Sequence, residues 1–128
     1  MAGLIPTAPK GVSVDANMKL IRSKFGKVVG PGDYYQFYQM VRNRGIWDYK
    51  QRGSQFENFG NFNYGAVGIA AGIPEGVLLN AAGCAQELAG TSSSNWGSCI
   101  RGIPPYSDDP NDQKYIKLGI QYAHQKGY

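Results

Sequence analysis

Carboxylic acids placed among aromatic residues are the groups in this sequence best suited to chemistry. Glu57 lies in the aromatic-rich stretch 56–62, and Asp48 directly follows a tryptophan. Apolar neighbours keep a carboxyl group protonated so that it can donate a proton, and a second, ionised carboxylate completes the minimum equipment for cleaving a glycosidic bond. We therefore predict that Glu57 is the proton donor. Its ionised partner is Asp48 or one of the adjacent acids Asp108 and Asp109.

Amide, hydroxyl and aromatic side chains around these acids are suited to binding a sugar. Asn and Tyr side chains can hydrogen-bond to N-acetyl and hydroxyl groups, and Trp rings can stack on sugar faces. Polar groups among aromatic residues are costly to bury unless each finds a partner, so folds tend to keep them for sites. The alternative is a glycine-rich turn in which the asparagines only satisfy backbone groups. The predicted substrate-binding residues are Trp47, Lys50, Asn58, Asn61, Asn63, Tyr64, Trp96, Tyr106, Asp108 and Gln113.

Several other kinds of chemistry find no support in the sequence. The glycines of residues 60–72 do not match the spacing of phosphate-binding loops. The single histidine, His124, is separated by helix and loop from every good nucleophile, which argues against Ser–His and Cys–His catalysis. One histidine and two cysteines are too few for a Cys/His metal site, so we expect no metal and no cofactor.

The two cysteines, Cys84 and Cys99, leave two interpretations open. A disulfide between them would close a short loop and contribute roughly 3 kcal/mol. Such a bond would indicate an oxidising compartment such as a periplasm. The alternative is two unrelated free thiols, with Cys84 as a small residue of the core.

Composition predicts one globular domain in 128 residues, with 42% hydrophobic and 17% charged residues. No apolar run approaches the ~20 residues that a membrane-spanning helix needs, so we expect no membrane insertion. The start has no basic stretch followed by an apolar core, as a signal peptide would. We interpret residues 1–13 as a linker from a larger carrier and 14–128 as the domain. The net charge of +4 favours polyanionic partners, either nucleic acid or the bacterial envelope.

Hydrophobic spacing predicts a mainly α-helical domain, lysozyme-like in character, with at most one small β-hairpin around residues 46–62 (an α+β fold). Small residues from 56 to 72 suit a tightly packed helix that lets its neighbours come close. Asp109 precedes Pro110 at the start of a last helix, so helix capping is the alternative to catalysis for Asp109 and for Asp112. The other predicted helices span 16–25, 34–43 and 74–89, and residues 91–108 form a long irregular segment.

Four blocks of the sequence resemble the bacterial polymorphic toxin type 44 domain. They are GVSVDANM, WDYKQ, FENFGNFNYGAVGIAAG and PPYSDDPNDQKYIKLGIQYA, and the resemblance extends from about Gly11 to Tyr122. The resemblance implies that the chain is the C-terminal toxin domain of a large secreted protein. Such proteins include Rhs-type carriers delivered by type VI secretion. It also implies an antibacterial effector that a cognate immunity protein neutralises in the producing cell.

The resemblance leaves the reaction open. We favour hydrolysis of peptidoglycan in the periplasm of the target cell, because acids, amides and aromatic rings suit a sugar cleft. The alternative is a ribonuclease acting in the cytoplasm, which would use the positive charge for phosphates and Lys50 or His124 with an acid for catalysis. A third interpretation is a binding toxin without enzymatic activity.

Overall fold

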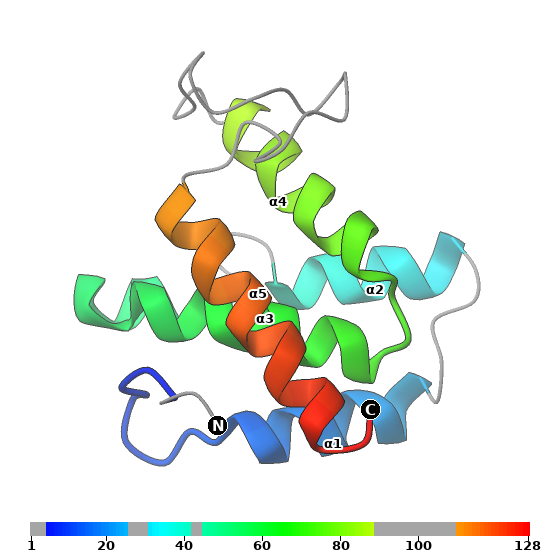
Figure 1. Cartoon of the computed structure of the whole chain (residues 1–128), viewed down its shortest axis with the longest axis horizontal. Coiled ribbons are helices and arrows are strands. Elements are labelled where there is room, and N and C mark those ends of the chain that lie inside the picture. Colours follow the sequence, from blue (N-terminus) through cyan, green and yellow to red (C-terminus); the bar gives the residue numbers. More distant parts are fainter. Residues whose placement is uncertain (1–4, 26–30, 42–44, 89–109) are drawn as a thin grey trace.

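The computed structural model describes residues 5–25, 31–41, 45–88 and 110–128, which form helices gathered around α3 (Figure 1). No strand occurs in these ranges, so the predicted mainly α-helical fold is confirmed. The main helices are α1 (Val14–Phe25), α2 (Pro31–Val41), α3 (Glu57–Ala70), α4 (Glu75–Leu88) and α5 (Pro110–Gln125). Two short 3-10 turns, η1 (Tyr49–Arg52) and η2 (Ser54–Phe56), precede α3.

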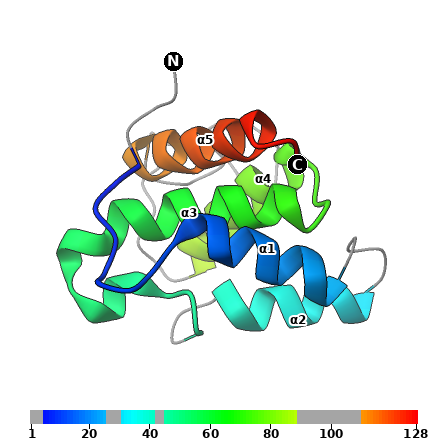
Figure 2. The ribbon, with the colours of Figure 1, turned by 90° about the horizontal axis from the view of Figure 1, so that it is seen from below.

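Helix α3 is the central helix of the fold. Figure 2 shows α5 on one side of α3 and α1 with α2 on the other. A helix that is covered on several sides needs apolar or small side chains on nearly all of its faces. From Gly65 to Ala70 every residue of α3 is buried, and the earlier Phe59 and Phe62 are among the largest fully buried side chains. The apolar second half of α3 is therefore the centre of the hydrophobic core.

Two glycines bring the backbones of α3 and α5 into direct contact. A Cβ atom on Gly65 would overlap the carbonyl oxygen of Ile116, and one on Gly119 would overlap the carbonyl oxygen of Phe62. The prediction that small residues around 56–72 form a tightly packed helix is therefore confirmed. Glycine and asparagine are weak helix formers, but burial against α5 outweighs that preference.

The small β-hairpin that the sequence allowed around residues 46–62 does not form. The segment contains η1, η2 and the first turns of α3 instead. Its backbone N–H groups make local bonds: Gln51 donates to the Asp48 carbonyl at 3.2 Å and Phe56 to that of Gly53 at 3.0 Å. These bonds use groups that a β-ladder would need. Gly53 has φ of 142°, a backbone conformation open to glycine, and it lets the chain turn from η1 into η2.

Helix boundaries differ from the predicted ones mainly at the starts. Helix α1 begins at Val14, two residues earlier than expected, because the Ser13 hydroxyl accepts a hydrogen bond from the Ala16 N–H at 3.2 Å. Helix α2 begins at Pro31 and not after Asp33, which suits a proline in the first helical position. Before α1, Pro9 is buried and Val12 is packed against the core.

Tyr122 joins α5 to α1 through a short hydrogen bond. Its hydroxyl donates to Asp15 Oδ1 at 2.7 Å, and the Tyr122 ring lies 5.5 Å from the Phe62 ring. Burial, followed by the bond to Asp15 and the charge of its carboxylate, raises the pKa of Tyr122 from 10.0 to about 12. The folded protein therefore keeps this proton at pH values where the unfolded chain has released it.

A Tyr122→Phe variant should be less sensitive to alkaline pH than the wild type. The stability from the raised pKa is fully present below pH 10 and is lost as pH rises from 10.0 to about 12. In urea titrations the wild-type free energy of unfolding should fall more steeply across this window than that of the variant. At pH 8 the variant should be less stable by about 1–2 kcal/mol because it lacks the hydrogen bond. Parallel pH dependences for both proteins would contradict this role of Tyr122.

Candidate functional site

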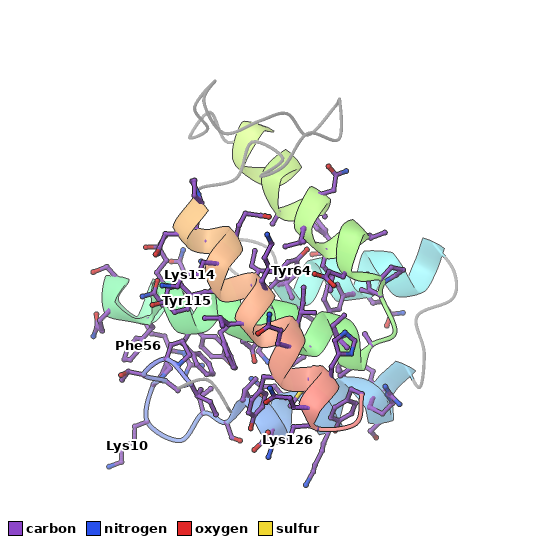
Figure 3. The ribbon with its side chains drawn as sticks, viewed as in Figure 1. Lys10, Phe56, Tyr64, Lys114, Tyr115 and Lys126 are labelled. Carbon is purple, nitrogen blue, oxygen red and sulfur yellow. The ribbon has the colours of Figure 1, made fainter. Side chains whose placement is uncertain are left out.

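The starting ends of α3 and α5 lie together on one side of the molecule. Asn111 Nδ2, in the first turn of α5, donates to Asn58 Oδ1, in the first turn of α3, at 3.3 Å. Figure 3 shows Phe56, the residue before α3, on the same side as Lys114 and Tyr115 of α5. The fold thereby brings the start of the FENFGNFNYGAVGIAAG block next to Asn111 of the last block, although the two are far apart in the sequence. We call the resulting surface the polar edge; it comprises Glu57, Asn58, Asn61 and Asn111. We include Asp48 because the next residue, Tyr49, packs against Phe59 of α3.

Glu57 is exposed at the first position of α3. The expectation that aromatic neighbours bury it is wrong, because Phe59 and Phe62 point into the core while Glu57 faces solvent. Asn58 and Asn61 are half-buried, and Asn61 lies one helical turn after both Glu57 and Asn58, so its side chain is a neighbour of each. Glu57 is thus accessible to a large substrate.

Asp48 lies beside the first turns of α3. It is half-buried, and its backbone N–H donates to the Gly45 carbonyl at 3.1 Å. The following residue, Tyr49, packs edge-on against Phe59 with ring centroids 5.1 Å apart. The segment that carries Asp48 is therefore fixed against the helix that carries Glu57.

Two of the predicted substrate-binding residues are inside the protein. Trp47 is 6% exposed, and its backbone N–H donates to the Met40 carbonyl at 2.9 Å. The expected stacking of Trp47 on a sugar is therefore wrong. Asn63 is 0% exposed, so the expectation that it contacts substrate directly is also wrong. Both residues were placed in the site because polar and aromatic residues alternate here, and that pattern does not show which side of α3 is covered.

Two further residues of the predicted set hold α4. The Tyr64 hydroxyl donates to the Leu78 carbonyl at 2.7 Å, and Gln113 Nε2 donates to the Leu79 carbonyl at 3.2 Å. Gln113 is buried and Tyr64 is half-buried. These bonds connect α3 and α5 to α4, and they give both residues a structural task whether or not they also meet a ligand.

Some predicted residues lie outside the part of the chain that the structure describes. They are Trp96, Tyr106, Asp108, Asp109 and Cys99. Lys50 belongs to η1 and Cys84 to α4, but their side chains are also outside the described part. The roles predicted for these residues therefore stay predictions.

An open groove of about 410 Å³ follows one face of α5 and begins at Pro110, the neighbour of Asn111 in the polar edge. Its lining combines lysines and glutamines with two apolar residues, which suits a ligand that is polar and partly anionic. The lining residues in the described chain are Pro110, Gln113, Lys114, Lys117, Leu118 and Gln121.

The single histidine is far from the polar edge. His124 is exposed in the last turn of α5, about 20 Å along the helix from Asn111 at a rise of roughly 1.5 Å per residue. Among the described residues no group of three or more His, Cys, Asp or Glu side chains could hold a metal ion. None of the helices searched there is long and apolar enough to cross a membrane.

A buried polar contact behind the polar edge was not anticipated. Asn17 Nδ2 on α1 donates to the Tyr49 hydroxyl at 2.9 Å and to Asn63 Oδ1 at 2.8 Å. Arg52 stacks on the outer side of Tyr49, with its Cζ 5.3 Å from the ring centroid. The only signal in the sequence is the proximity of Arg52 to Tyr49 in WDYKQR, because Asn17 is 32 residues away from Tyr49.

These features define a helical domain whose polar edge presents an exposed acid among amides, with an open groove along α5. The model of the bacterial toxin 44 family matches residues 18–125, which is most of the chain. The chain therefore belongs to the bacterial toxin 44 family and is a bacterial toxin domain. No curated protein and no solved structure matches it.

Proposed function

We propose that this domain is a secreted antibacterial effector that cleaves the glycan strands of peptidoglycan. The observation that carries the proposal is the meeting of α3 and α5 through Asn58 and Asn111, which places the exposed Glu57 among amide side chains. Amides suit the N-acetyl groups of the glycan, and a carboxyl group suits proton donation to a glycosidic oxygen. The groove along α5 begins at Pro110, next to Asn111, and would offer a long polymer additional binding surface.

The proposed reaction uses two carboxyl groups in different roles. Glu57 donates a proton to the leaving glycosidic oxygen as the bond breaks. Asp48, or Asp109 outside the described residues, stays ionised and supports the positive charge that develops on the sugar, or activates water. Because Glu57 faces solvent in the free protein, the bound glycan itself must cover this carboxyl group and remove water from around it.

A ribonuclease is the second candidate, and the lysines of the groove favour it because they would attract a polyanion. The position of His124 argues against a ribonuclease. General acid and base groups must lie within hydrogen-bond reach of the reacting atoms, and His124 is at the opposite end of α5 from the polar edge. Lys50 would have to act in its place.

The compartment in which the toxin kills separates the two candidates. The domain should be expressed in a susceptible bacterium with and without an added periplasmic export signal. Under the proposal, killing requires export and produces rounded or lysing cells. An exported Glu57→Gln protein is the control for any harm that export itself does to the cells. Killing from the cytoplasm with loss of RNA and intact walls would overturn the proposal in favour of the ribonuclease.

Delivery and neutralisation follow from the same proposal. A toxin that acts on the envelope must leave the producing cell, so we propose a carrier protein of a secretion system, of the Rhs type, as its first partner. The producing cell has the same peptidoglycan as its competitors, so it needs a cognate immunity protein that covers the polar edge.

A further inference from the structure

Arg52 is an exposed cation held in one place on the surface of the protein. It is the last residue of η1, and its guanidinium carbon lies 5.3 Å from the centroid of the Tyr49 ring. Within the described residues Arg52 has no ion-pair partner. A guanidinium that stacks on a ring leaves the N–H groups of its edge available, and these match the two oxygens of a carboxylate or a phosphate.

The ring beneath Arg52 is fixed by contacts from two helices. Tyr49 is 3% exposed, and its ring packs edge-on against Phe59 of α3. Its hydroxyl accepts a hydrogen bond of 2.9 Å from Asn17 Nδ2 of α1. Burial raises the pKa of Tyr49, so the hydroxyl stays neutral at physiological pH. The platform for Arg52 therefore belongs to the core, although Arg52 itself is on the surface.

Asn63 completes the support. It is 0% exposed on α3, and its Oδ1 accepts the second hydrogen bond from Asn17 Nδ2 at 2.8 Å. Asn63 Nδ2 has no hydrogen-bond partner within the part of the chain that the structure describes, although an unpaired buried amide group costs free energy. The hydrogen bond that Asn63 accepts helps to hold Asn17 in the position from which it donates to Tyr49.

We propose that Arg52 binds a carboxylate of the substrate, on the peptide stems that branch from the peptidoglycan glycan. This inference rests on the proposed function and adds the group that positions the strand. Arg52 ends the turn that begins directly after Asp48, and only Gly53 and η2 separate it from Glu57 in the chain. A carboxylate held at Arg52 would therefore place the attached glycan along the polar edge.

The surroundings of Arg52 favour a carboxylate over the phosphates of RNA. A nucleic acid is bound by several cations spread along its backbone. The acids Asp48 and Glu57 lie within a few residues of Arg52 in the chain and would repel the phosphates that flank one held at Arg52. One fixed guanidinium among such groups suits a substrate whose carboxylates are separated by uncharged sugar and peptide groups.

Binding to purified peptidoglycan sacculi tests the proposal in a Glu57→Gln background, where cleavage does not interfere. Co-sedimentation should be compared between native sacculi and sacculi whose carboxylates have been converted chemically to amides. We expect the parent protein to bind native sacculi about tenfold more tightly than amidated ones, and Arg52→Gln to bind both equally weakly. Arg52→Lys should recover only part of the preference for native sacculi, because an ammonium group lacks the planar pair of N–H donors that a guanidinium offers to a carboxylate.

Lys19→Gln is the matched control, since it removes one exposed positive charge from α1, a helix that contributes no residue to the polar edge. It should bind like the parent protein. An Arg52→Gln protein that still prefers native sacculi would overturn the inference. The inference would also be overturned if the protein bound single-stranded RNA through Arg52 and did not bind sacculi. If native sacculi are bound through Arg52 but the wild type does not cleave them, the proposed hydrolysis fails and the carboxylate site stands.

Discussion

A Glu57→Gln substitution should reduce killing by an exported domain at least about a hundredfold, the usual contribution of a general acid. The amide has nearly the shape of the carboxyl group but cannot give up a proton to the glycosidic oxygen. Because Glu57 is exposed and Phe59 and Phe62 make the core contacts of this part of α3, the fold should not change. The measurement is survival of cells that express the exported variant, with release of soluble sugar fragments from sacculi as the direct assay.

Glu75→Gln is a matched control for this substitution. Glu75 is also exposed and also stands in the first turn of a helix, α4, so the change in charge and in helix-end electrostatics is the same. It should kill like the wild type. A folded Glu57→Gln protein that kills as well as Glu75→Gln would remove Glu57 from the mechanism, whatever the substrate.

The same assay identifies the second carboxylate. Asp48→Asn and Asp109→Asn should differ in their effect, since only one of the two acids can face Glu57 across the bound sugar. Asp109 also precedes Pro110 at the start of α5, where a capping role would make its loss visible in the melting temperature. Loss of activity without loss of stability marks the partner acid.

The helices could be predicted because their signals are local. Apolar residues at helical spacing, a proline at the start of α5 and small residues in α3 each act within a few positions of the chain. The segment 46–62 could not be predicted, because its structure depends on distant partners. Tyr49 is fixed by Asn17 from α1, 32 residues earlier, and Trp47 by the end of α2. Without these contacts a short hairpin is an equally reasonable interpretation of the same residues.

The candidate site shows a similar division. Residue type singled out Glu57 and Asn58, and both lie at the solvent-facing start of α3, where their role in a reaction stays a prediction. Residue type did not show burial, so Trp47 and Asn63 were assigned to the substrate although they are inside. Arg52 drew no site prediction for the opposite reason: an arginine on the surface is ordinary, and only the buried ring in contact with it distinguishes its position.

A Gly119→Ala substitution should destabilise the protein by about 3 kcal/mol, the upper range for forcing an extra atom into a packed interface. The added Cβ would overlap the carbonyl oxygen of Phe62, so α5 would have to move away from α3. Helix propensity opposes this loss, since alanine is better than glycine in a helix by about 1 kcal/mol. Gly76→Ala isolates that opposing effect, because nothing lies within 4 Å of a Cβ there.

Urea unfolding of the two variants therefore gives shifts of opposite sign if α3 and α5 touch through their backbones. Gly76→Ala should be slightly more stable than the wild type, and Gly119→Ala much less stable. Equal stability of Gly119→Ala and the wild type would mean that the helices do not approach this closely. The hydrogen bond between Asn58 and Asn111 depends on the same approach, so a Gly119→Ala protein that remains folded should also kill poorly. The close packing of α3 against α5 therefore supports both the hydrophobic core and the polar edge.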